Sequence, residues 1–281
     1  MEIQWYPGHM TKARRAMQED IKLVDLIIEI LDARVPRSSR NPDIAELGKN
    51  KFRLIVLNKA DLADPAVTAA WETYFQAQGA FVAALDARTR GQMPALLKTV
   101  REACREKIER DRRRGILGRP VRAMVAGIPN VGKSTLINSL AGKSVAKTGN
   151  KPGVTRGDQW IRLNREVELL DTPGILWPKF GDPQVGRHLA AIGSVRDEIL
   201  DREELAAEVL RLLREHYPED LAARFPDLPE QGPEALMQIA ESRKAVKKGG
   251  EPDTEKAAAI LLEEFRSGKL GRISLERPEE G

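Results

Sequence analysis

The chain has 281 residues, with 46 lysines and arginines against 42 aspartates and glutamates, so its formal net charge is +4. This length suffices for one sizeable α/β domain and a smaller second domain, while a mean hydropathy of -0.41 without a long apolar run excludes a membrane-spanning helix. A single cysteine, Cys104, excludes an internal disulfide and is expected only to pack; with no secretory signal at the N-terminus, we expect a cytoplasmic protein.

The first part of the chain alternates short apolar runs with amphipathic stretches. Apolar residues at helical spacing predict a helix over 10–24, and compact apolar runs predict buried strands over 25–31, 53–57 and 80–85. Between the last two strands, Asp64-Pro65 is typical of a helix start. The residues expected on the buried face of that helix are Val67, Ala70, Trp71, Tyr74 and Phe75.

A second group of elements follows a long charged helix, which is predicted over 91–114. A strand over 121–126 and a helix over 133–140 come next, and 160–163 with 167–170 are predicted to form a hairpin. The alternation of strands and helices indicates an α/β fold. We expect a mostly parallel six-stranded sheet that helices cover on both faces, which gives three layers.

From about residue 180 only helical patterns remain. Asp201 is the expected cap of the first of these helices, a middle helix is predicted to extend to Val246, and Thr254 is the expected cap of the last. We therefore expect two domains, an α/β domain over 1–178 and a small all-helical domain over 179–281.

A phosphate-binding motif joins the strand over 121–126 to the helix that follows it. Gly127-Ile128-Pro129-Asn130-Val131-Gly132-Lys133-Ser134 fits the pattern G-x-x-x-x-G-K-[ST], whose glycines let backbone amides converge on phosphate oxygens at a helix N-terminus. Lys133 is expected to bridge the β- and γ-phosphates, and the Ser134 hydroxyl to bind Mg²⁺. We assign nucleotide contacts to Asn130, Val131, Gly132, Lys133, Ser134 and Thr135.

Two short motifs after this P-loop stand in the order of GTPase switches. Thr155, in Gly153-Val154-Thr155, is expected to give Mg²⁺ a second hydroxyl and to contact the γ-phosphate. Asp171, which opens Asp171-Thr172-Pro173-Gly174, is expected to hold Mg²⁺ through water, and the Gly174 amide to sense the γ-phosphate. Each motif is weak alone, and its register after a P-loop gives it weight.

The motif that selects guanine comes before the P-loop instead of after it. In Asn58-Lys59-Ala60-Asp61, the Asp61 carboxylate can accept from the N1-H and N2-H₂ of guanine, a pair of donors that adenine lacks. Asn58 is expected to donate to the base and tie down the P-loop, and the Lys59 stem to pack on the ring. Asp86-Ala87-Arg88 stands where a base-backing element lies, so the Ala87 amide is a further expected contact. The order of these motifs predicts a circularly permuted P-loop GTPase.

The residue that many GTPases use to orient the attacking water is replaced. Ile175 follows Gly174 where a glutamine usually stands, so hydrolysis by the isolated protein should be slow. His9 begins the helix that the permutation places beside the γ-phosphate, which makes it the candidate catalytic residue; a surface histidine in a flexible N-terminus is the equal alternative. His188 and His216 lie in helical patterns and are expected to be structural.

Positive charge is concentrated in three short groups of residues. Each group alone is more simply a solvated helix face, but together with a nucleotide switch they favour an RNA partner. We predict that Lys244, Lys247 and Lys248 bind RNA phosphates from the polar side of a helix. The three groups are Arg112, Arg113 and Arg114; Arg243, Lys244, Lys247 and Lys248; and Arg266, Lys269 and Arg272.

These motifs and their order resemble the ribosome biogenesis GTPase A family, also called YlqF, nearly from end to end. The resemblance implies a GTPase that acts late in assembly of the large ribosomal subunit and is stimulated by that particle. It also implies that His9 assists hydrolysis, that Asn130 lets K⁺ act as an added counter-charge, and that the helical domain binds RNA. The stretches that carry it are Trp5-Tyr6-Pro7-Gly8-His9-Met10, Asp32-Ala33-Arg34-Val35-Pro36, Ser38-Ser39-Arg40-Asn41-Pro42, residues 127–140 and Leu170-Asp171-Thr172-Pro173-Gly174-Ile175-Leu176-Trp177-Pro178.

We therefore expect a ribosome-assembly GTPase that binds GTP or GDP with Mg²⁺, docks on rRNA of the large-subunit precursor in the GTP state, and leaves after hydrolysis. It should not bind membranes and should be a monomer away from the ribosome. Two alternatives stay open: a regulatory GTPase with a protein partner and no RNA, and an ATP-using enzyme in which Asn58 to Asp61 is coincidental. A steep salt dependence of rRNA binding and competition of GTP against ATP separate them.

Overall fold

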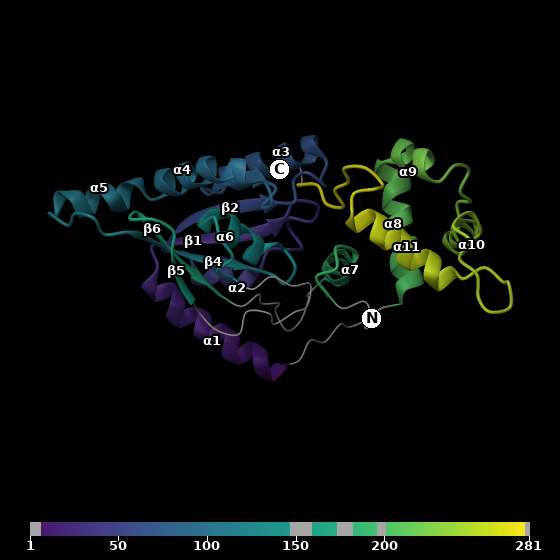
Figure 1. Ribbon diagram of the computed structural model, residues 1–281, viewed down its shortest axis with the longest axis horizontal. Coiled ribbons are helices and arrows are strands. Elements are labelled where there is room, and N and C mark those ends of the chain that lie inside the picture. The colour runs from purple at the N-terminus through teal and green to yellow at the C-terminus, as the bar shows by residue number, and fades with distance from the viewer. Residues whose placement is uncertain (1–6, 147–158, 173–181, 196–200, 279–281) are drawn as a thin grey trace.

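The computed structural model describes residues 7–146, 159–172, 182–195 and 201–278, with side chains from residue 15 onward. Within these residues no helix is both long enough and apolar enough to cross a membrane. Figure 1 shows two parts, a sheet with its covering helices and a group of helices beside it.

The sheet has six strands in the order β3-β2-β1-β4-β6-β5. β4 stands near its centre, with the strands that precede it in the chain on one side and those that follow it on the other. β5 pairs antiparallel with β6, and all other neighbours are parallel. This confirms the mostly parallel six-stranded sheet and the hairpin. The strands are β1 Leu26–Asp32, β2 Phe52–Asn58, β3 Phe81–Leu85, β4 Val121–Gly127, β5 Gln159–Arg162 and β6 Val167–Asp171.

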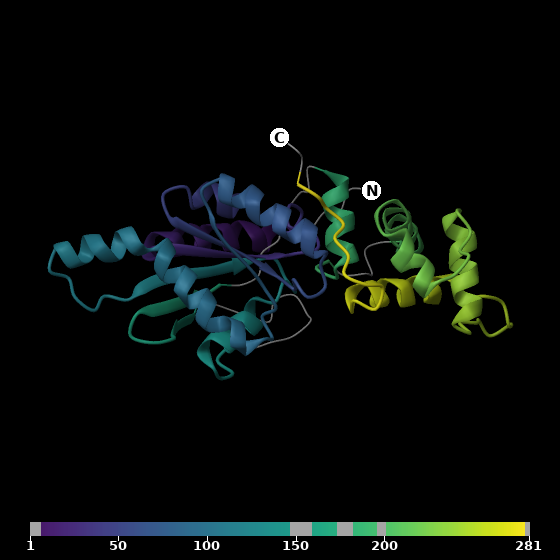
Figure 2. The same cartoon turned by 90° about the horizontal axis from the view of Figure 1, so that it is seen from above.

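Helices cover both faces of the sheet, because most side chains of its central strands are apolar and are buried on both sides of the sheet. One face packs against α1 (Pro7–Leu23), α2 (Pro42–Leu47) and α3 (Pro65–Ala77). The other packs against α4 (Met93–Ala103) and α6 (Lys133–Ala141). Figure 2 shows the sheet between these two layers. The predicted three layers are confirmed.

The charged stretch after β3 is not the single long helix that the sequence predicts. A short 3-10 turn leads into α4, and α5 (Arg105–Arg113) begins only after a break at Cys104. Cys104 packs in the core, and burial raises the pKa of its thiol to about 12, so it is a packing residue as expected. In α3, Ala70 and Tyr74 are exposed, and the buried face consists of Val67, Thr68, Trp71 and Phe75.

The helical part contains α7 (Pro183–Ala191), α8 (Arg202–His216), α9 (Pro218–Arg224), α10 (Gly232–Ser242) and α11 (Thr254–Arg266). Asp201 caps α8, since its carboxylate accepts from the amides of Glu203 and Glu204 at 2.9 and 3.1 Å. The cap of α11 is Asp253, which accepts from the Lys256 amide, and not Thr254.

The middle helix is shorter than the sequence predicts. The Ala245 amide donates to Ala240 O at 2.8 Å, and Lys244 takes a left-handed backbone conformation with φ of 54°, which closes α10. Lys244, Lys247 and Lys248 therefore lie in the connection between α10 and α11 and do not share a helix face.

The chain after α11 returns to the sheet part of the molecule and packs on it (Figure 2). The amides of Ile273 and Leu275 donate to Leu62 O at 3.0 Å and Arg34 O at 2.8 Å, and Trp71 Nε1 donates to Glu276 O at 3.1 Å. The division into 1–178 and 179–281 stays a prediction, but these last residues contact both parts.

Candidate functional site

Five parallel strands end at the same edge of the sheet, and each delivers a motif residue there. β2 ends at Asn58, β3 leads into Asp86-Ala87, β4 leads into the P-loop, β6 ends at Asp171, and β1 ends at Asp32. This is the edge at which open α/β sheets bind ligands. The segments that the sequence assigns to phosphate and to base therefore meet, although one precedes the other in the chain.

Two residues of the P-loop have a left-handed backbone, which limits the residue types that fit there. Gly132 has a φ of 99°, and a Cβ at this position would collide with the amide nitrogen of the Asn58 side chain. Asn130 is also left-handed, with a φ of 61°. α6 begins directly after Gly132 without a side-chain cap among the described residues, so its first amides face the loop. Such a helix start is suited to an anion.

Two charged groups meet at the start of α6. Lys133 is buried, and its Nζ donates to Asp171 Oδ1 at the end of β6. Ser134 and Thr135 follow in the first turn and are half-buried. A hydroxyl and a carboxylate are oxygen donors of the kind that Mg²⁺ takes, so the residues present fit this ion.

The guanine motif is tied to the P-loop as predicted. Asn58 Nδ2 donates to Val131 O at 2.7 Å, and Asn58 Oδ1 accepts from the Ala87 amide at 2.9 Å. The Ala87 amide that we expected on a base is thus already engaged. Ala87 also accepts from Ser139 Oγ of α6 at 2.6 Å. The base side and the phosphate side of the site form one hydrogen-bonded unit.

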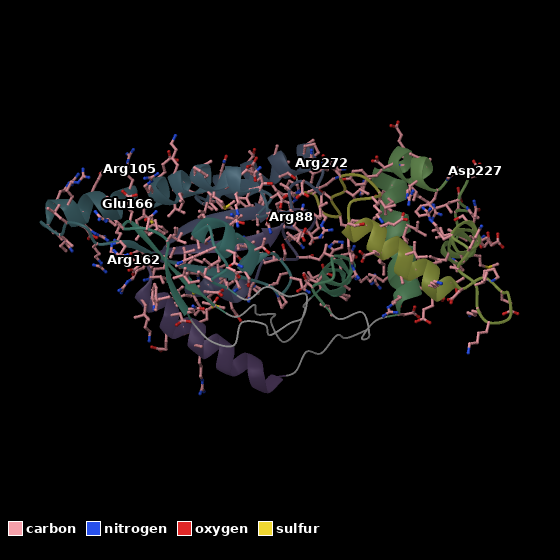
Figure 3. The ribbon with its side chains drawn as sticks, in the orientation of Figure 1. Arg88, Arg105, Arg162, Glu166, Asp227 and Arg272 are labelled. Carbon is pink, nitrogen blue, oxygen red and sulfur yellow. The ribbon has the colours of Figure 1, made fainter. Side chains whose placement is uncertain are left out.

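Asp61, the expected guanine acceptor, is partly exposed and paired. Arg88 Nη2 donates to Asp61 Oδ2 at 2.6 Å, while Arg88 Nε donates to Asp86 Oδ1 at 2.9 Å (Arg88 is labelled in Figure 3). The Asp61 side chain is 33% exposed to solvent. A base that bonds to Asp61 would therefore have to share or replace a charged hydrogen bond.

Comparison with known proteins agrees with this geometry. Residues 122–223 match the family model of the 50S ribosome-binding GTPase. The ribosome biogenesis GTPase A of Priestia megaterium is 47% identical over 100% of this chain and 98% of that protein, and that of Thermotoga maritima is 33% identical over 99% and 95%. The chain belongs to the ribosome biogenesis GTPase A family.

A solved structure supports the same family. The crystal structure of GNP-bound YlqF from T. maritima matches with a TM-score of 0.72 and 30% identity, over 96% of this chain and 99% of that one. The protein is thus a circularly permuted α/β GTPase of ribosome biogenesis, which binds and hydrolyses GTP. The alternative of an ATP-using enzyme is excluded at the level of the family.

The structure places a buried ion pair beside the family's base motif that our sequence analysis did not assign to the site. Asp32 accepts from Arg34 Nε at 2.9 Å, Arg34 Nη2 at 2.8 Å and Lys59 Nζ at 2.9 Å. Burial alone would raise the pKa of Asp32, but the charges and hydrogen bonds of Arg34 and Lys59 outweigh it and hold this pKa well below its usual range. Asp32 therefore stays ionised and fixes Lys59.

Lys59 and Asn130 connect this pair to the P-loop and to α7. Lys59 Nζ also donates to Asn130 O at 2.9 Å, and Asn130 Nδ2 donates to Gly193 O, just after α7, at 2.9 Å. One signal of Asp32 was present in the sequence, because it ends an apolar strand as Asn58 and Asp171 do. Its partners were not visible without the fold.

Several predicted site residues lie outside the part of the chain that the structure describes. Thr155, Gly174 and Ile175 fall in 147–158 and 173–181, and only the backbone of His9 is described, in the first turn of α1. His188 is buried, and its Nδ1 lies 2.8 Å from Glu276 Oε1, which is the structural role expected for it. His216 is exposed at the end of α8, and the structural role expected for it stays a prediction.

Proposed function

We propose that this GTPase acts in late maturation of the large ribosomal subunit. In the GTP state it binds rRNA of the precursor particle, the particle stimulates hydrolysis, and the protein leaves afterwards as a monomer. The name of the matching family model, a 50S ribosome-binding GTPase, supports the large subunit as partner. The names of the relatives support a role in ribosome biogenesis.

The proposed RNA contact rests on the lysines in the connection between α10 and α11. Lys244, Lys247 and Lys248 are exposed there, and none of them forms an ion pair among the described residues. Figure 1 shows this loop at one end of the molecule, away from the sheet. Unpaired lysines on a projecting loop can approach phosphates closely and release counterions.

Replacing Lys244, Lys247 and Lys248 together by alanine should weaken binding to rRNA or to the precursor particle. The log-log salt dependence should flatten by about two to three units, because each phosphate contact contributes a slope near 0.7 to 0.9. GTP hydrolysis by the isolated protein should not change. Filter binding across a salt series measures the first two quantities.

The matched control removes three charges at the other end of the molecule. Residues 105–119, which include α5, hold seven basic and three acidic residues, and their net charge of +4 equals that of the whole chain. The control variant replaces Arg112, Arg113 and Arg114 by alanine. If this variant loses affinity and salt slope while the lysine variant keeps both, the RNA surface lies at α5 and the assignment to the lysine loop is wrong.

Within the nucleotide site, each group has a proposed task. The P-loop amides and Lys133 would hold the phosphates; Ser134, Thr155 and, through water, Asp171 would hold Mg²⁺, which would supply positive charge against the β- and γ-phosphates. K⁺ near Asn130 is proposed as a further counter-charge. Lys133 Nζ, which contacts Asp171 Oδ1 in the structure, would contact phosphate oxygens instead when GTP binds, and the Asp171 carboxylate would then be free to help hold the metal.

Communication with the helical part is proposed to pass through contacts of the P-loop. Residues 173–181, which join β6 to α7 along the chain, lie outside the described residues. The described contact is Asn130 Nδ2 to Gly193 O, since Gly193 also packs on Arg266 of α11. Arg266 in turn donates to Ala190 O and Ala191 O at the end of α7. A change at the phosphates can thus bias the helices through a two-state element.

A further inference from the structure

The loop that carries Asp61 is held by the far end of the chain. We define the base loop as residues 59–64 and the C-terminal segment as residues 269–277. Arg272 Nη2 donates to Ala60 O at 2.8 Å, and Arg272 Nε donates to Ala63 O at 2.9 Å. Figure 3 labels Arg272 and Arg88, which approach this loop from different parts of the chain.

Backbone hydrogen bonds complete the contact. The Ile273 amide donates to Leu62 O at 3.0 Å, and the Asp64 amide donates to Ser274 Oγ at 3.1 Å. Ala60, Leu62, Ala63 and Asp64 of the base loop therefore all bond to residues 272–274. Asp61 lies between two of them.

The C-terminal segment is itself fixed to Tyr217, which lies between α8 and α9. The Ser274 amide donates to the Tyr217 hydroxyl at 3.1 Å, and this hydroxyl lies 3.2 Å from Asp64 Oδ2. Ile273, Ser274 and Leu275 are buried. The segment is thus an ordered support and not a loose tail, and it joins the base loop to the helical part.

We propose that Arg272 is a positioning residue for guanine recognition, through which the C-terminal segment sets the place of the Asp61 carboxylate. The base loop needs this support because Lys59 is in the left-handed region, with a φ of 59°, which a lysine rarely adopts. Lys59 and Asp61 flank Ala60, whose carbonyl Arg272 holds. A guanidinium can bridge two carbonyls in a fixed fork, whereas an ammonium cannot do so in the same geometry.

This inference rests on the proposed role of Asp61 and has its own test. Inosine triphosphate lacks the 2-amino group of guanine, so it can make only one of the two bonds to Asp61. The ratio of GTP affinity to ITP affinity therefore reports where the carboxylate stands. Loss of folded protein would change the number of binding sites but not this ratio.

In the full-length protein, Arg272→Ala should weaken GTP binding by about tenfold, because two charged hydrogen bonds to the loop are lost. Both nucleotides should fall toward the affinity that the phosphate contacts alone provide, so the GTP-to-ITP ratio should drop toward one. Arg272→Lys should not restore the ratio, since it keeps the charge but not the bridge. The matched control is Arg211→Ala, which removes an exposed arginine whose ion pairs among the described residues are with Glu208 and Glu215 of α8.

A ratio unchanged from that of the wild type in Arg272→Ala, or a ratio fully restored by Arg272→Lys, would overturn the proposal. A second measurement needs no variant. Because coupling is reciprocal, GTP should slow amide hydrogen exchange at residues 272–275 of the wild-type protein. Slower exchange at the P-loop without any change at 272–275 would also overturn it. If Asp61→Asn leaves the base preference unchanged, the proposed role of Asp61 in guanine recognition is wrong. This result differs from those that would contradict only the positioning role of Arg272, so the two hypotheses are tested separately.

Discussion

Asp61→Asn should transfer the preference of this GTPase from GTP toward xanthosine triphosphate. The carboxylate accepts from N1-H and the 2-amino group of guanine, whereas an amide can donate to the 2-carbonyl of xanthine. A site built on such a bond rejects the wrong base strongly, so GTP affinity should fall on the order of 10²-fold or more. Competition binding with both nucleotides measures the change.

Asp86→Asn is the matched control for this substitution. It removes the same charge from the same neighbour, because Arg88 bonds to both carboxylates. Its preference for GTP over xanthosine triphosphate should match that of the wild type. If Asp61→Asn also binds GTP as tightly as the wild type, Asn58 to Asp61 does not form the base site, and the ion pair with Arg88 is only a surface contact.

The sheet and the order of the motifs were predictable because local sequence determines them. Apolar runs that end in Asn58, Gly127 or Asp171 are typical of buried parallel strands, and the carboxyl ends of such strands share one edge. The P-loop and the guanine motif then had to meet at that edge, whichever came first in the chain. This is why the permutation was visible without coordinates.

The contacts that support the site were not predictable, because they join residues that lie far apart in the sequence. Arg272 and Ala60 are 212 positions apart in the chain, and Arg34 and Arg266 are 232 apart. No periodicity or motif links such residues, and an exposed arginine near a helix end has the same pattern whether it is solvated or bonded. In the sequence, Arg272, Arg266 and Lys269 form one group of positive charge, but in the structure Arg272 and Arg266 donate to backbone carbonyls.

Helix ends were missed where an unusual residue closes them. Lys244 occupies a left-handed position, and where helices end in this conformation the residue is usually glycine, so the sequence offered no stop signal before Val246. At Cys104 the apolar spacing continues across the break between α4 and α5. In both places tertiary packing outweighs the local pattern.

The position of His9 follows from the direction of α1. Only Val24 and Asp25 separate α1 from β1, so the helix runs back along the strand, and Met17, Ile21 and Val24 pack on the sheet. A helix of 17 residues spans roughly 25 Å, and a strand of seven about 23 Å. The first turn of α1 therefore points toward the end of the sheet at which the P-loop and Asp171 stand, while Figure 1 shows it below the sheet and apart from the strands.

His9→Ala should consequently impair catalysis far more than binding. If the histidine orients the attacking water in place of the glutamine that Ile175 replaces, turnover stimulated by the large-subunit precursor should fall by about 10- to 10³-fold. Affinities for GTP and GDP should stay within about twofold, because the amides and Lys133 still hold the phosphates. His216→Ala is the matched control, since it removes an exposed histidine from α8. Stimulated hydrolysis at the wild-type rate in His9→Ala would exclude the histidine from the reaction, and the water would have to be oriented by a group of the particle.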